Sequence, residues 1–312
     1  MKIWNDKRYY SLDYYLKQTY GEKVYKVSLD GGMTCPNRDG KIGVGGCIFC
    51  SAGGSGDFAA PKSDSVTTQI DKAIEGISRS KSVGSKFIAY FQAFTNTYAP
   101  VEYLKKLFTE ALAHPNIVGL SIATRPDCLP DDVLELLSDL NKIKPVWVEL
   151  GLQTTNEESA VFIRRGYPLS VFDDAVQKLH TLGIESIVHL IVGLPRETRE
   201  DILNSVRHVS QLPIQGIKLQ LLHVLKGTDL AKHLDEFHVL TMDEYVNLVI
   251  ACLEILPENI VVHRITGDGP KDLLLAPTWS TRKREVMNRI NQELARRDTW
   301  QGRLNPITRK EN

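Results

Sequence analysis

The sequence of 312 residues lacks several features that mark special classes of protein. It contains no run of about 18 uninterrupted apolar residues, which a membrane-spanning helix needs, and its first segment, MKIWNDKRYYSLDYY, lacks the apolar core of a signal peptide. The 38 basic and 38 acidic side chains cancel, which argues against a uniformly basic surface for nucleic acid. With 42% hydrophobic and 24% charged residues, we expect a folded cytoplasmic protein with no membrane partner.

The sequence also lacks the paired cysteines of a disulfide framework, because it has five and the cytoplasm is reducing. Three of them, Cys35, Cys47 and Cys50, lie within the segment CPNRDGKIGVGGCIFC. Cys128 in RPDCLP and Cys252 in VNLVIACLEIL stand apart, and we expect both to be buried, inert thiols. The clustered cysteines therefore indicate a metal site, which three merely buried cysteines would explain less well.

Three clustered thiolates suit two kinds of metal centre. One is a zinc ion that takes a fourth ligand from elsewhere, and the other is a [4Fe–4S] cluster with one iron left open. Glycines between Gly40 and Gly46 let the loop curl so that Cys35 returns to the CxxC pair. Zinc is the weaker interpretation, because the nearest downstream histidine, His114, lies beyond a full βα unit.

Short β-branched or aromatic runs alternate with amphipathic segments, a pattern that predicts repeated βα units. The expected parallel strands are 24–29, 86–91, 118–123, 146–152, 186–192 and 217–222, and the expected helices are 66–80, capped by Ser65, 101–113, 131–140, 171–182 and 199–211. Crossovers of this length favour an α/β fold, a partial (β/α)6 TIM-like barrel with a C-terminal helical extension. The alternative is a doubly wound open sheet, but GGMTCPNRDG is not the phosphate-binding turn of that fold.

We divide the chain into three regions on this basis. Residues 1–23 form an N-terminal extension, residues 24–230 the barrel, and residues 231–312 a C-terminal extension that packs on the barrel and provides candidate contacts to substrate or RNA. In a barrel, the chemistry lies where the strands end, and the predicted strand ends are unusually polar.

The cysteine segment resembles that of the radical S-adenosylmethionine (SAM) superfamily, with Phe49 as the aromatic residue of CxΦC. Eleven residues separate Cys35 from Cys47, whereas the commonest pattern of the superfamily is CxxxCxxC. The bacterial YtqA/YhcC family, related to the radical SAM part of the Elongator catalytic subunit, is closely similar over almost the whole chain. The segments that carry this resemblance are LDGGMTCPNRDG, GGCIFCSAGGSGDF, YFQAFTNTYAPVE, SIATRPDCLPDD, VELGLQT, HLIVGLPRET, LLHVLKGT and VHRITGDGP.

The resemblance implies that Cys35, Cys47 and Cys50 bind a [4Fe–4S] cluster whose open iron chelates the amino and carboxylate groups of SAM. One electron from an external donor of flavodoxin or ferredoxin type would cleave SAM to methionine and a 5′-deoxyadenosyl radical, which abstracts a substrate hydrogen. It also implies tRNA as the substrate, at the 5-substituent of wobble uridine, such as the step from carboxymethylaminomethyl to aminomethyl. The alternatives are a radical SAM enzyme acting on another small molecule or peptide, and a non-catalytic, zinc-bound RNA-binding protein.

The end of the predicted strand 86–91 holds three candidate SAM contacts. At FQAFTNT, where the superfamily often carries a GGE-like motif for the SAM amino group, Gln92, Thr95 and Asn96 are assigned by position only. The alternative is that Asn96 and Thr97 cap the following helix, near Pro100.

The next two strand ends hold the other candidates. Arg125 either pairs with a carboxylate of SAM or substrate, or orders its turn by pairing with Asp127. In VELGLQT, Glu149 and Gln153 alternate with apolar residues, so both point inward, where hydroxyls or the ammonium group of SAM would satisfy them. The alternative for Glu149 is a structural salt bridge. The roles of four further residues stay open, namely His189, Lys226, His263 and Arg264.

Charge is distributed unevenly along the chain. From Arg282 to Asn312, nine basic residues face four acidic ones, an excess of +5 that the preceding part balances. Arg282, Arg289 and Arg296 recur every seven residues on one helix face, which would suit phosphate contacts, with Trp300 as a stacking residue. The alternative is the solvated face of a packing helix.

Overall fold

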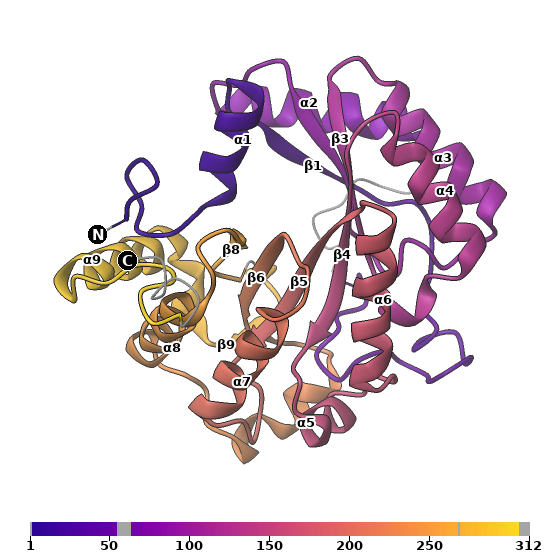
Figure 1. Cartoon of the computed structure of the whole chain (residues 1–312). Helices are drawn as coiled ribbons and strands as arrows, with labels where there is room; N and C mark the ends of the chain where they lie inside the picture. Colours follow the sequence, from indigo (N-terminus) through magenta and orange to yellow (C-terminus); the bar gives the residue numbers. More distant parts are fainter. Residues whose placement is uncertain (1, 55–63, 268, 306–312) are drawn as a thin grey trace.

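The computed structural model describes residues 2–54, 64–267 and 269–305. Within these residues, a curled sheet of seven parallel strands carries helices on its outer side (Figure 1). The strands follow the order β1 (Tyr25–Leu29), β2 (Phe87–Phe91), β3 (Ile117–Thr124), β4 (Val146–Gln153), β5 (Glu185–Val192), β6 (Gly216–Leu221) and β8 (Val261–Arg264). Because neighbours in this sheet follow one another in the sequence, the arrangement is that of a partial barrel.

The connecting helices and smaller elements complete the fold. The α-helices are α1 (Leu12–Tyr20), α2 (Val66–Ser80), α3 (Val101–Ala113), α4 (Asp131–Asn141), α5 (Glu157–Phe162), α6 (Leu169–Thr181), α7 (Arg199–Val209), α8 (Met242–Ile255) and α9 (Lys283–Arg296). Short 3-10 helices are η1 (Pro126–Cys128), η2 (Asp229–Glu236) and η3 (Thr278–Thr281), and β7 (Val224–Leu225) pairs antiparallel with β9 (Leu274–Ala276).

Local sequence explains how several elements begin and pack. Ser65 caps α2 as predicted, since its Oγ accepts a hydrogen bond from the backbone N–H of Thr68. Thr198 and Thr241 form capping boxes at α7 and α8. β2 is buried at every position, because helices cover one face of a barrel strand and the opposite strands cover the other.

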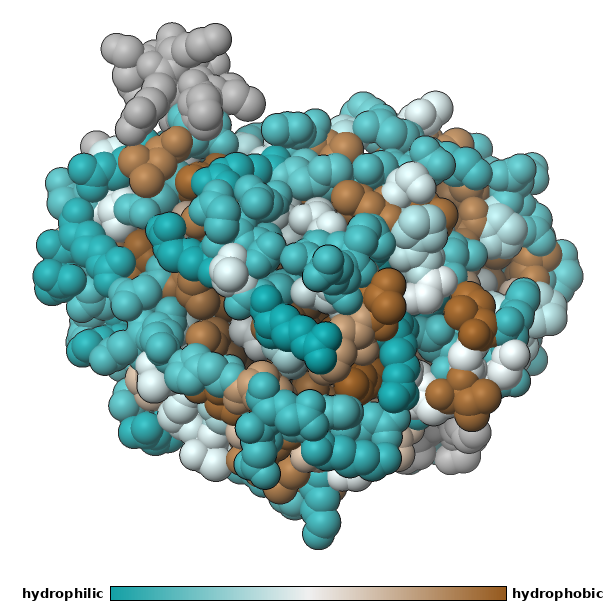
Figure 2. Space-filling model, turned by 90° about the horizontal axis from the view of Figure 1, so that it is seen from below, coloured by the Kyte–Doolittle hydropathy of each residue, from teal (hydrophilic) through white to brown (hydrophobic). Residues whose placement is uncertain are grey.

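α1 closes the end of the barrel at which the strands begin. Leu16 packs there in a buried cluster with Trp147 and Ile187. The backbone N–H of Val262 donates to the carbonyl of Tyr10, so the N-terminal segment also pairs with the edge strand β8. The opposite end is left to the loops that follow the strands, and Figure 2 shows this face as mainly hydrophilic with a hollow at its centre.

The structure confirms the predicted partial barrel, and the strand order never reverses as it does in a doubly wound sheet. All six predicted strands and all five predicted helices are present, with boundaries shifted by at most two residues. The sheet has one strand more than predicted, because β8 pairs with β6 and comes from the region assigned to the C-terminal extension. Four residues are too short a run to stand out in a sequence. None of the helices among the described residues is long and apolar enough to span a membrane.

Candidate functional site

The three clustered cysteines lie on the long loop between β1 and α2, at the end of the barrel where the strands finish. Cys35, Cys47 and Cys50 are free thiols of intermediate exposure, and all three line one cavity of about 150 Å³. The backbone N–H of Cys50 donates to the carbonyl of Cys47 at 2.9 Å, which turns the CxxC segment back on itself. One loop therefore delivers three thiols to the barrel mouth, as the sequence predicts.

Hydrogen bonds and nearby cations favour a thiolate in this cavity. The pKa of Cys47 is lowered to about 7, first by a hydrogen bond from the Cys50 thiol and then by Asn37, Arg125 and Arg38. The side-chain amide of Asn37 donates to Cys47 Sγ at 3.5 Å. Because the thiolate is the form that binds metals, this environment suits a metal centre.

Five of the six candidate SAM contacts line the same cavity as the thiols. They are Gln92, Thr95, Arg125, Glu149 and Gln153. A second, larger cavity of about 650 Å³ shares Cys50, Gln92 and Gln153 with the first and opens between β6 and the segment before β9. The structure thus brings together residues from the first loop and from four strand ends.

Gln153 has an unusual conformation and an unpaired acceptor. It ends β4 with a φ of 70°, in the left-handed region that side chains rarely adopt. Its Oε1 is buried and has no hydrogen-bond partner among the described residues. A strained residue with an orphaned acceptor at the cavity wall suits a ligand that donates a hydrogen bond, such as an ammonium or hydroxyl group.

The residues present therefore fit a [4Fe–4S] cluster with SAM. Such a cluster binds each cysteine through a different iron, so its thiolates need not converge on one point as zinc ligands do. Among the residues that the structure describes, no three His, Cys, Asp or Glu side chains converge to hold a single metal ion. The cavity supplies three thiols, and Gln153 adds an acceptor for SAM.

Glu149 lies deeper in the barrel and is fully buried. Its Oε1 accepts hydrogen bonds from Lys26 Nζ at 2.5 Å and Ser121 Oγ at 2.7 Å. Its Oε2 accepts from His189 Nε2 at 2.7 Å and from Lys218 Nζ. The structure thus contains the salt bridge that the sequence analysis held as the alternative for Glu149, and its contact with SAM stays a prediction.

These contacts form a polar layer that crosses the barrel. It joins one inward residue from each of six strands, namely Lys26, Tyr90, Ser121, Glu149, His189 and Lys218. Burial, and next Lys218, lower the pKa of His189 to about 4, so its ring is neutral near pH 7. Neutral His189 donates from Nε2 to Glu149, while Nδ1 lies 3.4 Å from Gln220 Nε2 and accepts from it.

The sequence analysis missed Lys26, Tyr90, Ser121 and Lys218. A usable signal is present, because polar residues stand at alternate positions in otherwise apolar strands: Lys26 precedes Ser28, and Lys218 precedes Gln220. The same alternation of polar and apolar residues led to the prediction that Glu149 and Gln153 point inward.

Arg125 forms the turn contact that was its alternative role. Its guanidinium makes two hydrogen bonds to the Asp127 carboxylate, at 2.9 and 2.8 Å, and a third to the Arg165 carbonyl at 2.9 Å. Because most of its donors are used in this way, Arg125 orders the loop after β3. It also borders the cavity, where its contact with a ligand carboxylate stays a prediction.

Asn96 does not line the thiol cavity, and the alternative helix-cap role for Asn96 and Thr97 is wrong. The Asn96 amide donates to the carbonyls of Phe91 and Ala123, at 3.0 and 2.8 Å, and thereby ties the ends of β2 and β3 together. Thr97 likewise bonds to Thr124. α3 begins after Pro100 with no side-chain cap, because these side chains face the sheet.

Three residues whose roles the sequence left open lie in three different surroundings, namely Arg264, His263 and Lys226. Arg264 lines both cavities. His263 is directed against Trp147, with ring centroids 5.5 Å apart, and burial foremost lowers its pKa. Lys226 is exposed and lines neither of these cavities.

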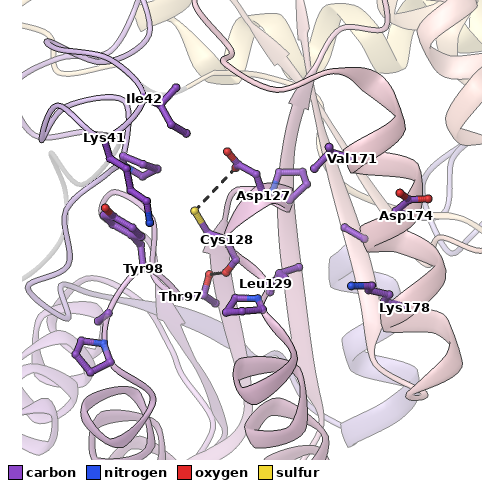
Figure 3. Close-up of a pocket in the computed structure, with 16 residues that line it drawn as sticks. Lys41, Ile42, Thr97, Tyr98, Asp127, Cys128, Leu129, Val171, Asp174 and Lys178 are labelled. Carbon is purple, nitrogen blue, oxygen red and sulfur yellow. Dashed lines mark hydrogen bonds between the residues drawn. The ribbon is translucent and has the colours of Figure 1, made fainter.

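Cys128 and Cys252 are buried, as predicted, and burial raises the pKa of each to about 12. Cys128 lines a further cavity of about 740 Å³ outside the barrel mouth (Figure 3). There Lys41 and Tyr98 face α6 across the cavity, and Cys128 Sγ lies 3.9 Å from Asp127 Oδ1. A thiol held in its neutral form is unreactive, which agrees with the inert role expected of both residues.

The basic stripe on α9 consists of ion pairs. Arg282 pairs with Glu285, Arg289 with Asp243 and Arg296 with Glu293, while the opposite helix face is buried against α8. This is the solvated face of a packing helix, the alternative for this stripe. Trp300 lies under the guanidinium of Arg303, with 5.3 Å from Cζ to the ring centroid. Arg309 and Lys310 lie outside the described residues.

Comparison with known proteins identifies relatives of this chain. The model of the Radical SAM superfamily matches residues 37–209, and the model of the Radical_SAM C-terminal domain matches residues 214–296. The uncharacterized protein YtqA of Bacillus subtilis is 49% identical over 301 residues, which cover 96% of this chain and 93% of YtqA. Protein YhcC of Escherichia coli is 37% identical and covers 85% of each chain.

More distant similarities are to a tRNA uridine(34) acetyltransferase in sequence and to an Elp3 protein in structure. A tRNA uridine(34) acetyltransferase of Methanocaldococcus jannaschii is 26% identical over 169 residues, 52% of this chain and 30% of that protein. Among solved structures, Elp3 of the archaeon Methanocaldococcus infernus superposes with a TM-score of 0.67 over 89% of this chain and 64% of that one. At 16% identity, this match shows a shared fold.

Proposed function

The chain belongs to the radical SAM superfamily, and from that premise we propose that it modifies tRNA at the 5-substituent of wobble uridine. In the proposed step, the CH2 group of the carboxymethyl substituent would lose a hydrogen atom and an electron, with SAM as the net two-electron oxidant that ends as methionine and 5′-deoxyadenosine. Water would then cleave the C–N bond, so that the carboxymethyl group leaves as glyoxylate and aminomethyluridine remains. The support for this proposal is the similarity to a tRNA uridine(34) acetyltransferase over half of the chain, together with the polar interior of the barrel.

The thiol cavity carries the chemical part of the proposal. Cys35, Cys47 and Cys50 would hold the [4Fe–4S] cluster, which together with SAM supplies hydrogen-atom abstraction when bound. Gln153 would accept a hydrogen bond from SAM through its orphaned Oε1, and Gln92 and Thr95 line the cavity beside it.

Residues of the chain itself would keep water away from the cavity and hold the surrounding strands together. α1 covers the far end of the barrel with apolar side chains, which hinders the entry of water from that end. Glu149, held by four hydrogen bonds, ties the strands together below the cavity. An external one-electron donor of flavodoxin or ferredoxin type is part of the proposal, as is a cytoplasmic reaction.

Reconstitution tests the chemistry. The protein loaded with iron and sulfide under anaerobic conditions should bind about four irons and form 5′-deoxyadenosine from SAM after addition of dithionite. Bound zinc together with intact SAM would reject the enzyme and favour a zinc-bound RNA-binding protein.

Nucleoside analysis tests the substrate. In a deletion strain, mass spectrometry of tRNA should show carboxymethylaminomethyluridine accumulating and aminomethyluridine disappearing. The wild-type chain should restore the profile and the Cys47→Ala variant should not. An unchanged wobble-uridine profile in the deletion strain rejects the tRNA assignment while leaving the superfamily chemistry intact.

A further inference from the structure

The cavity beneath the cysteine loop carries more positive than negative charge. Among the described residues that line it, Glu149 is the only carboxylate. The cations that line it are Arg38, Arg125, Arg165, Lys218 and Arg264. Such an excess inside a barrel requires counter-charges beyond Glu149.

At the rim, the positive charges are already matched. Arg125 and Arg165 pair with carboxylates beside the cavity, each at 2.8 Å. Arg38 and Arg125 line the cavity beside the three cysteines, whose thiolates would compensate these charges when a metal centre is bound. The excess positive charge therefore lies at the deep end of the cavity, its floor, which Lys26, Glu149 and Lys218 form.

On the floor, two ammonium groups share one carboxylate. Lys26 Nζ lies 2.5 Å from Glu149 Oε1, and Lys218 Nζ bonds to Oε2. The exposed fraction of the side chain is 16% for Lys26, 6% for Lys218 and 0% for Glu149. His189 adds no positive charge near pH 7, since burial and then Lys218 lower its pKa to about 4. With both lysines protonated, the floor thus carries one positive charge more than its single carboxylate compensates.

Lys218 is the cation that reaches the cavity with a donor to spare. Of its three N–H groups, one goes to Glu149 and one to the Tyr90 hydroxyl at 3.2 Å, and the described residues provide no acceptor for the third. Burial is the main reason that the pKa of Lys218 falls to about 7, and Lys26 and Arg264 lower it further. A bound anion would remove this electrostatic cost.

The geometry points to Lys218 as the group that binds a carboxylate of the substrate on the cavity floor, with Glu149 and Tyr90 holding its ammonium group in place. This inference rests on the proposed function, in which the substituent on the uridine ends in a carboxymethyl group. One carboxylate matches the single uncompensated charge.

SAM also has a carboxylate, but the structure separates the two positions. Lys218 precedes the end of β6 by three residues, which places it about 10 Å below the strand end. The thiols stand on the loop above the strand ends, and the carboxylate of SAM is expected at the iron there. The floor is therefore left for the substrate.

Binding to matched RNA ligands tests the assignment. The ligands are two anticodon stem-loops, one with carboxymethylaminomethyluridine and one with its uncharged methyl ester. We would measure their affinities for the reconstituted, SAM-bound protein and its Lys218→Met and Lys226→Met variants. Lys218→Met removes the ammonium but leaves Glu149 paired with Lys26, so the barrel should fold. Lys226→Met is the matched control, because Lys226 is exposed and lies outside the cavity.

The wild type should prefer the free carboxylate by about 10-fold or more, as a hydrogen bond to a charged group predicts. Lys218→Met should lose this preference with unchanged affinity for SAM, and Lys226→Met should keep it. The inference is overturned if Lys218→Met still prefers the free carboxylate to the methyl ester, or if this variant loses affinity for SAM instead of the preference.

Failure of the proposed function looks different. In that case, the wild type would convert neither RNA. Binding of N-methylglycine, a small carboxylate probe, then tests the carboxylate site by itself. Binding of the probe by wild type and Lys226→Met, but not by Lys218→Met, keeps the carboxylate site, whereas equal binding or no binding rejects it.

Discussion

Glu149→Gln is the most informative single change, because Glu149 is the one carboxylate that compensates two buried ammonium groups. Glutamine keeps the size and one acceptor but removes the charge. Lys26 and Lys218 would then face each other across a buried layer with no counter-charge.

The expected loss follows from this geometry. Breaking a buried ion pair by removing one partner costs about 3–5 kcal/mol. For a chain of this size, that corresponds to a fall in Tm of roughly 5–8 °C. The loss should be greater at pH 5.5 than at pH 8.5. Lys218 has a pKa of about 7, which falls further without Glu149, so the variant relieves the repulsion as its ammonium deprotonates with rising pH.

Urea titrations of the full chain at both pH values measure the free energy of unfolding. Glu200→Gln is the control, since Glu200 pairs with Arg207 on the surface and should cost less than about 1 kcal/mol. Adding Lys218→Met to Glu149→Gln should restore part of the loss, because it removes one uncompensated charge. A single variant within about 1 kcal/mol of wild type, or a double variant that is less stable still, would refute the reasoning.

Three further predictions concern the same region. Cys47→Ala should lose its iron while its circular dichroism stays that of a folded barrel, and Cys128→Ala should keep its iron; a full iron content in Cys47→Ala would show that the ligand assignment is wrong. Gln153→Ala should bind SAM about 10-fold more weakly with unchanged iron, as measured by equilibrium dialysis, and an unchanged Kd contradicts a role for its orphaned acceptor. The pKa of His189 falls from 6.5 to about 4, first through burial, so the unfolded chain binds more protons between these values and stability declines as the pH falls through them, by up to about 3 kcal/mol. His189→Gln should flatten this decline in urea titrations at pH 4.5 and 6.5, and an equal slope in both proteins counts against a buried neutral histidine.

Sequence patterns predicted most of the barrel because its elements are set by local periodicity. The strands that become β2 and β4 are apolar runs of ordinary length, and their helices carry a clear apolar face. β8 escaped notice because it has four residues, and it becomes a strand by pairing with β6 and the N-terminal segment. The alternative helix-cap role of Asn96 was wrong for a related reason, since its partners, Phe91 and Ala123, lie on two different strands.

The sequence alone predicts the cysteine site, but it does not predict the contacts on the floor of the barrel. Three thiols on one glycine-rich loop, with two residues between Cys47 and Cys50, are a local feature. The sequence by itself therefore determined that they lie together after the first strand, and it predicted a metal site there. The partners of Glu149 were decided only by the tertiary structure. Lys26 lies 123 residues before it and Lys218 lies 69 residues after it, and strand order and register are what bring these charges to one carboxylate.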